Sequence, residues 1–219
     1  IGDKRGIANS LNNIGIIYEV QGNYAKAIDY YNRTLKIDEE LGDKRGIART
    51  LNNIGIIYQA QGVSAKAIEY NTQSLKINEQ IGDKQSIAKS LNNIGIIYKN
   101  QCDYAKAIDY YTRSLKIHEE IGDKRGIAYS LNNIGNIYYN QSDYGKAIDY
   151  YTRSLKNHEK IGDKRGIASS LNRIGNIYYN QGDYGKAMDY YTKSIKIRLE
   201  IGSKEGIAES LNNIGIVYK

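Results

Sequence analysis

The sequence predicts an all-α solenoid, built from antiparallel helix pairs that stack side by side. Three observations predict it: a long internal repeat, apolar residues at helical spacing within each copy, and a complete absence of proline, with 22 glycines left to end the helices. We expect a single array over residues 1–219. Its copies are 1–40, 41–80, 81–120, 121–160 and 161–200, followed by the first helix of a sixth copy over 201–219.

A first helix is expected in the first copy from about Lys4 to Val20, with Asp3 as its N-cap. Its apolar stripe consists of Ile7, Leu11, Ile14 and Tyr18. Gly15 lies on this stripe and recurs in every copy, although an interior glycine costs a helix about 1 kcal/mol relative to alanine. We therefore expect a neighbouring helix to approach closely at this glycine.

A second helix is expected from about Tyr24 to Glu40, capped by Asn23. In later copies the cap is Asp103, Asp143 or Asp183. Its buried face consists of Ala27, Ile28, Tyr31 and Leu35. Because only a short turn at Gln21-Gly22 separates the two helices, they should form an antiparallel hairpin.

The copies differ at a few structural positions. The second copy has Val63 at the cap and Asn71 in place of the core Tyr31, so we expect it to be the least stable. Cys102 and Ser142 replace the turn glycine, Gly22. If this turn is left-handed, each replacement costs about 1 kcal/mol.

These residues carry a family resemblance. The spacing of Leu11, Ile14, Gly15, Tyr18, Ala27 and Tyr31 resembles the tetratricopeptide repeat, with Leu for the usual Trp. The resemblance covers the whole chain. Its long repeat is similar to those of kinesin light chains, of adaptors with GoLoco motifs and of bacterial regulatory arrays. It implies a right-handed superhelix whose first helices line a concave, partner-binding groove.

Asparagine pairs mark the part of each first helix that the resemblance places in the groove. They are Asn12-Asn13, Asn52-Asn53, Asn92-Asn93 and Asn132-Asn133, with Asn172-Arg173 as the variant. A carboxamide both donates and accepts hydrogen bonds, so the pairs could hold the backbone of an extended peptide. Alternatively, they tie adjacent repeats together. Both interpretations can hold, one for each member of a pair.

Other groove positions vary between copies. Ile16, Ile56 and Ile96 give an apolar floor in the first three copies, whereas Asn136 and Asn176 replace them later, beside Tyr139 and Tyr179. Arg49, Lys89 and Lys99 make the middle basic. This pattern predicts apolar contacts toward the N-terminus and polar, aromatic contacts toward the C-terminus, unless the variation is neutral.

Several function classes are not expected. The net charge of +7 and the recurring Lys4-Arg5 pairs could attract nucleic acid, but each pair follows a capping Asp, so we interpret them as solvated. His118 and His158 are expected to be solvated surface residues, and no catalytic, cofactor or metal motif is present. The only cysteine, Cys102, favours a reducing compartment such as the cytoplasm.

The sequence thus predicts a protein-interaction module, not an enzyme, that binds an extended peptide or a helix in its groove. The partner would be a protein or peptide, acidic or mixed in polarity, and no membrane is expected. The uncapped ends could cause weak self-association. The alternative is a structural or engineered repeat scaffold with no natural ligand. The chain opens in the middle of the pattern, which suggests a fragment.

Overall fold

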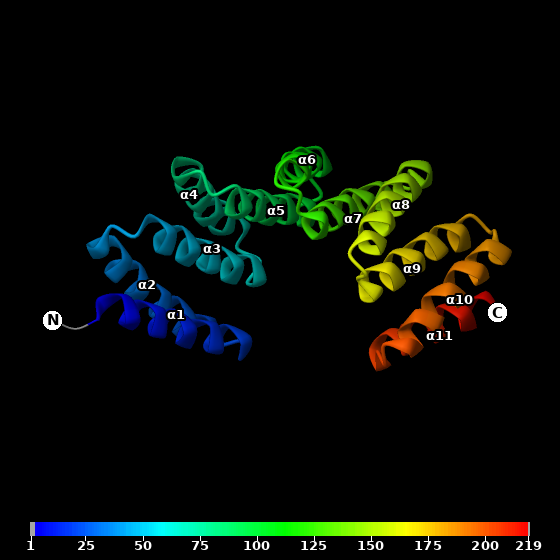
Figure 1. Ribbon diagram of the computed structural model, residues 1–219, viewed down its shortest axis with the longest axis horizontal. Coiled ribbons are helices and arrows are strands. Elements are labelled where there is room, and N and C mark those ends of the chain that lie inside the picture. The colour runs from blue at the N-terminus through cyan, green and yellow to red at the C-terminus, as the bar shows by residue number, and fades with distance from the viewer. Residues whose placement is uncertain (1–2, 219) are drawn as a thin grey trace. The chain divides into compact units, whose positions relative to one another are not determined.

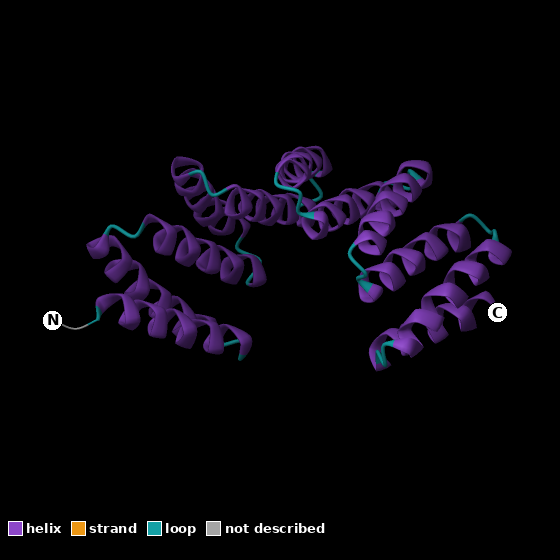
Figure 2. Cartoon of the chain, viewed as in Figure 1, coloured by secondary structure: helices purple, strands orange, loops and turns teal. Residues whose placement is uncertain are grey.

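The computed structural model describes residues 3–218, and in this range it contains eleven α-helices and no strand (Figures 1 and 2). The helices are α1 (Lys4–Val20), α2 (Tyr24–Leu41), α3 (Lys44–Ala60), α4 (Ser64–Ile81), α5 (Lys84–Asn100), α6 (Tyr104–Glu120), α7 (Lys124–Asn140), α8 (Tyr144–Lys160), α9 (Lys164–Asn180), α10 (Tyr184–Glu200) and α11 (Lys204–Val217). The predicted all-α repeat array and its alternating first and second helices are confirmed. None of the described helices is long and apolar enough to cross a membrane.

The chain divides into two compact units, Ile1–Ile117 and His118–Lys219, with the boundary near the end of α6. In the first unit, α1 to α5 pack in chain order, each helix against the next (Figure 1, blue to green). In the second unit, α7 to α11 do the same (Figure 1, green to red). The single array over residues 1–219 stays a prediction.

Most helices begin where a side chain caps them. Asp3 Oδ1 accepts a hydrogen bond from the Gly6 N–H at 2.8 Å, and Asn23 Oδ1 accepts one from the Lys26 N–H at 3.3 Å. Val63, the residue before α4, makes no such bond because its side chain has no acceptor. The caps therefore lie where the sequence places them.

The recurring spacing of glycine and tyrosine builds the core of each hairpin. A Cβ on Gly15 would lie 2.6 Å from Cε1 of Tyr31, and one on Gly95 would lie 2.7 Å from the same atom of Tyr111. Both tyrosine side chains are fully buried. The first helix thus keeps a glycine because the tyrosine ring of the second helix lies against its backbone, as expected.

The second copy replaces this ring with a buried carboxamide. Asn71 Oδ1 accepts a hydrogen bond from Asn52 Nδ2 at 2.9 Å, and Asn71 Nδ2 donates to the Ala67 carbonyl at 2.8 Å. Asn71 is fully buried, so this core layer is polar where the other copies are aromatic.

Candidate functional site

The first member of most asparagine pairs is buried. Asn12, Asn52, Asn92 and Asn172 are between 2% and 7% exposed, and Asn132 is half-buried. Side chains this far from solvent present little surface to a partner. The second members differ, since Asn13 is exposed and Asn53, Asn93, Asn133 and Arg173 are half-buried.

Several of these side chains link adjacent copies within a unit. Asn53 Nδ2 donates to Asn12 Oδ1 at 3.2 Å, and Asn213 Nδ2 donates to Asn172 Oδ1 at 3.0 Å. Asn93 Nδ2 reaches Asn71 Oδ1 at 3.4 Å. These bonds are the ones expected if the asparagine pairs tie neighbouring repeats together, which is the second of the two interpretations given above.

In the second unit the asparagines that replace isoleucine accept hydrogen bonds from buried tyrosines. The Tyr151 hydroxyl donates to Asn136 Oδ1, and the Tyr191 hydroxyl donates to Asn176 Oδ1, both at 2.8 Å. Burial raises the pKa of Tyr191 to about 12, with Tyr139 and Tyr179 adding to the effect, so its hydroxyl keeps the proton that it donates. Arg173 Nη1 also donates to Asn136, at 2.6 Å.

The remaining predicted groove residues lie at or near the surface. Ile16 is exposed, Ile56 and Ile96 are half-buried, Arg49 and Lys89 are exposed, and Lys99 is half-buried. Tyr139 and Tyr179 are half-buried and pack in tilted contacts on Tyr144 and Tyr184, with ring centroids 6.0 and 5.6 Å apart.

A pocket in the second unit brings three of the predicted residues together. Its volume is about 200 Å³. It is lined by Tyr139, Asn176, Tyr179, Asn180, Tyr191, Asn213 and Ile216. Six of these side chains come from the first helices α7, α9 and α11, and Asn180 Nδ2 donates to the Tyr139 hydroxyl at 2.8 Å across it.

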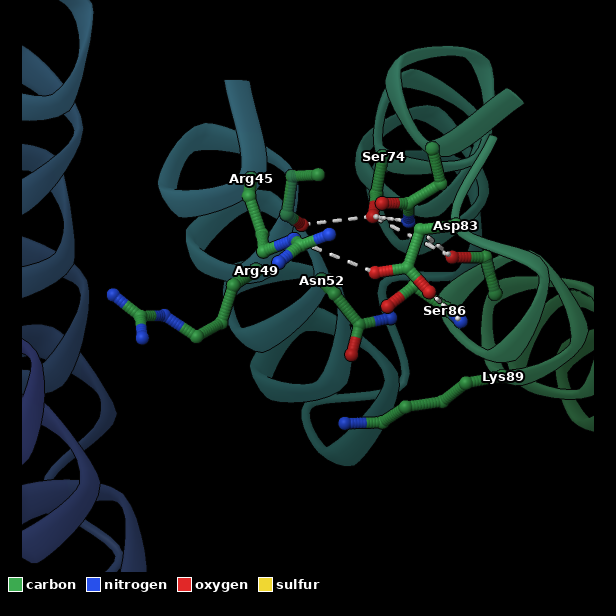
Figure 3. A pocket seen from close by; sticks show the side chains of 10 residues that line it. Arg45, Arg49, Asn52, Ser74, Asp83, Ser86 and Lys89 are labelled. Carbon is green, nitrogen blue, oxygen red and sulfur yellow. Dashed lines mark hydrogen bonds and ion pairs between the residues drawn. The ribbon is translucent and has the colours of Figure 1, made fainter. Parts of the chain in front are cut away.

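A larger pocket, of about 310 Å³, lies between α3, α4 and α5 in the first unit (Figure 3). It is lined by Arg45, Ala48, Arg49, Asn52, Ser74, Asn78, Asp83, Ser86, Lys89 and Ser90. Arg49, Asn52 and Lys89 were predicted groove residues. Arg45, Asp83 and Ser86 were missed, because they lie near helix ends and look like ordinary capping or solvated side chains. Ser74 and Ser90 were also missed, although they are buried in the interiors of α4 and α5.

The expectation that both histidines are solvated is wrong. His118 and His158 are only 9% and 8% exposed. Each Nδ1 lies 3.0 Å from a capping carboxylate, that of Asp123 or Asp163. The spacing of Ala147, Tyr151, Ser154 and His158 continues the buried stripe of α8 by one more turn, which is the signal that would have revealed it. Within residues 3–218 no cluster of His, Cys, Asp and Glu could hold a metal ion.

The fold and these pockets define a helical-repeat protein with polar recesses between neighbouring helices. Family models described as tetratricopeptide repeat match residues 6–80, 86–160 and 168–198. The chain therefore belongs to the tetratricopeptide repeat family. No curated protein matches the sequence.

Solved structures share the fold at low identity. BtubC (BKLC) from P. vanneervenii is 22% identical with a TM-score of 0.80, over 89% of this chain and 81% of its own. A Rap protein complexed with Competence and Sporulation Factor is 19% identical with a TM-score of 0.76, over 95% of this chain and 61% of its own.

A Podosopora anserina putative kinesin light chain with nearly identical repeats is 13% identical with a TM-score of 0.71, over 90% of this chain and 97% of its own. These neighbours, which include kinesin light chain-like repeats, share the fold of the tetratricopeptide repeat family. The chain spans less than two thirds of the Rap protein, so nothing about the activity of that whole protein follows for this one.

Proposed function

We propose that this chain is a protein-interaction module that binds an extended peptide along the faces of its first helices. The observation that carries the proposal is the pair of pockets, one in each unit. Each is lined by predicted groove residues from successive first helices: Arg49, Asn52 and Lys89 in one, and Tyr139, Asn176 and Tyr179 in the other. Concave recesses with a few convergent polar groups are the usual form of ligand sites.

The chemistry of the pocket walls suits a peptide backbone. Asn180 is exposed, so its carboxamide can donate to and accept from an extended main chain. Asn213 is half-buried and its Nδ2 already donates to Asn172 and Asn176, so it offers a peptide its acceptor oxygen. The tyrosines beside them offer flat apolar area with little entropy to lose, as interface anchors do. A helical ligand already pairs its backbone N–H and C=O groups with each other, so these carboxamides would have no backbone groups to bind. An extended segment therefore fits better.

One structural neighbour supports the proposal by analogy. The Rap protein with the same repeat fold was solved in complex with Competence and Sporulation Factor. The likeness concerns the fold alone, so it supports binding by the array and says nothing of which ligand this chain takes.

A swap of groove residues between copies tests the proposal. Asn136→Ile and Asn176→Ile together install the residue found in the first three copies, while Ile56→Asn does the reverse, so each variant uses a side chain that the repeat already accommodates. The purified chain and both variants are exposed to an array of random dodecapeptides. We expect the double variant to lose polar peptides and gain apolar ones. Identical binding profiles for all three proteins would contradict the proposal, as would binding no stronger than that to control peptides of scrambled sequence.

We also propose a cytoplasmic location, on the ground that the single cysteine, Cys102, is exposed and free. An exposed thiol with no partner in its chain suits a reducing compartment. Fractionation of the source cells checks this, and recovery from an oxidising compartment would contradict it.

A further inference from the structure

We propose that the pocket lined by residues of α7, α9, α10 and α11 binds the guanidinium group of an arginine side chain in the peptide ligand. The inference deepens the proposed function, on which it rests, by naming the ligand chemistry at one position of the peptide. The equivalent place one copy earlier already holds a guanidinium group of this chain, that of Arg173.

Arg173 lies between α7 and α9 in a neutral environment. Its Nη1 donates to Asn136 Oδ1 at 2.6 Å, and its guanidinium carbon lies 5.9 Å from the centre of the Tyr151 ring. The same Asn136 oxygen accepts the Tyr151 hydroxyl at 2.8 Å. Arg173 forms no ion pair within residues 3–218, so a carboxamide oxygen and a ring face hold this guanidinium without a carboxylate.

One copy later the shorter Asn213 takes the position of Arg173, and the place is open. Asn213 Nδ2 donates to Asn172 Oδ1 at 3.0 Å and more weakly to Asn176 Oδ1, at 3.4 Å. The Tyr191 hydroxyl donates to Asn176 Oδ1 at 2.8 Å, as its equivalent does one copy earlier. The tyrosine and the carboxamide of the site are thus retained, and the pocket of about 200 Å³ lies beside them.

The pocket groups that a ligand can reach are oxygen acceptors and rings. Asn180 and Ile216 are exposed, and Tyr139, Tyr179 and Asn213 are half-buried. Both asparagines already use their Nδ2 groups, since that of Asn180 donates to the Tyr139 hydroxyl at 2.8 Å. Their Oδ1 atoms accept no hydrogen bond among the described residues. The wall therefore offers two free carboxamide oxygens beside two tyrosine rings.

A guanidinium group matches this wall better than other groups do. It is planar, carries five N–H donors and no acceptor, and stacks on aromatic rings. An ammonium group is more strongly hydrated and does not stack, so it loses more on entering a pocket without a carboxylate. A carboxylate or phosphate group would face oxygens that only accept. None of the lining residues is charged, so no cation in the wall repels an arginine.

Small probes test the inference by NMR on the ¹⁵N-labelled 219-residue chain. The arms are N-acetylarginine amide, N-acetylcitrulline amide as the neutral planar isostere, and N-acetyllysine amide as the non-planar cation. The arginine probe should shift the signals of Asn180 and Asn213 saturably. It should bind at least about fivefold more tightly than either other probe, because only it combines charge with a stacking plane.

Matched variants locate the binding. Asn213→Arg supplies the guanidinium from the chain itself, as Arg173 does one copy earlier, and should abolish binding of the arginine probe. Asn212→Arg is the control, since it adds the same charge at an exposed residue outside the pocket lining and should change nothing. Tyr179→Gln installs the residue of the second copy, Gln59, and should weaken the probe about fivefold because one ring is lost.

Salt dependence separates this pocket from ion pairing at the surface. Binding of the arginine probe should persist as the salt concentration rises, because no carboxylate lines the pocket. Equal or tighter binding of the lysine or citrulline probe would overturn the inference. So would unchanged binding by the Asn213→Arg variant, loss of binding in salt, or no saturable shift with the arginine probe.

The outcomes also distinguish this inference from the proposed function. Among the dodecapeptides that the wild-type chain binds, those with arginine should be enriched, and Asn213→Arg should lose this preference. If dodecapeptides bind with no such preference, the arginine pocket fails and peptide binding stands. If the arginine probe binds here while no dodecapeptide does, the proposed function fails instead.

Discussion

Asn71 occupies the core position that tyrosine fills in the four other complete copies, yet the glycine that makes room for the ring is still present as Gly55. A Cβ on Gly55 would lie 2.4 Å from Asn71 Nδ2, so the carboxamide now fills part of the space for the ring. The replacement exchanges apolar burial for three polar contacts. Net hydrogen bonds contribute less than a buried aromatic ring, which makes this layer weaker than its neighbours.

Asn71→Tyr should therefore stabilise the first unit. We expect the free energy of unfolding to rise by about 1–2 kcal/mol, since the new ring buries apolar area while Asn52 and Asn93 lose an acceptor. Urea unfolding followed by circular dichroism measures the change. The reciprocal variant, Tyr111→Asn, should cost about 3 kcal/mol. A loss of stability on Asn71→Tyr would show that the carboxamide cluster is the better core.

Asp38 gives a pH-dependent prediction. It is buried, and burial raises its pKa above the ordinary 3.8, with the nearby Asp43 adding to the effect and Arg49 opposing it. The folded chain thus binds this proton more tightly than the unfolded chain. The contribution of Asp38 to stability is complete below the ordinary pKa and is lost as the pH rises through the raised value.

Asp38→Asn should remove this dependence, because the amide resembles the protonated acid and Asn78 already occupies the equivalent position. We expect a higher Tm than wild type at pH 7 and a difference that shrinks to nothing near pH 3. Thermal unfolding across that range measures it. Asn78→Asp serves as the reverse control and should lower the Tm at pH 7 only. A difference that is constant with pH would exclude the titration of Asp38 as its cause.

At the scale of the helices, the turn between first and second helix requires a left-handed residue. Gly22, Gly62 and Gly182 have φ between 73° and 76°, while Cys102 and Ser142 adopt φ of 61° and 60° at the same position. The conditional prediction of a left-handed turn is confirmed. Nothing lies within 4 Å of a Cβ built on Gly22, so the strain at Cys102 and Ser142 comes from the backbone alone.

Cys102→Gly and Ser142→Gly should each raise the free energy of unfolding by about 1 kcal/mol. Denaturant unfolding of the two single variants and of the double variant measures this, and the two effects should add because the turns lie in different units. Gly62→Ser is the control and should lose a similar amount. An unchanged midpoint for all four variants would mean that the turn tolerates side chains at no cost.

The helices and part of the site could be predicted from the sequence. The expected first helix, Lys4 to Val20, is observed with the same bounds, because cap, apolar stripe and closing turn all lie within one copy. The burial of Asn12 could not be predicted in the same way, since it depends on a neighbouring helix that the pattern of its own helix does not describe. The burial of His158, in contrast, follows from the buried stripe of its own helix, α8, and was overlooked. The pocket between α3, α4 and α5 was not predicted from the sequence either, because its walls come from two copies of the repeat, with Arg49 in one and Asp83 in the next.

At the scale of the whole chain, each helix pair is stabilised mainly by the pairs next to it, so the last described helix differs from its equivalents. Leu211 of α11 is 54% exposed, whereas Leu171, the same position in α9, is 8% exposed. A Cβ on Gly215 would meet nothing within 4 Å, whereas one on Gly175 would lie 2.7 Å from Tyr191. The side of α11 that a second helix covers elsewhere is open among the described residues.

The 219-residue chain should therefore self-associate weakly through this open face. We expect the weight-average sedimentation coefficient to rise with concentration from the micromolar to the millimolar range. Leu211→Glu should abolish the rise, because it places a charge on the open apolar face. Leu199→Glu is the matched control, since Leu199 is similarly exposed but lies on α10, and it should leave the rise intact. A monomer at every concentration would show that exposed apolar area on one helix is too small to hold two chains together.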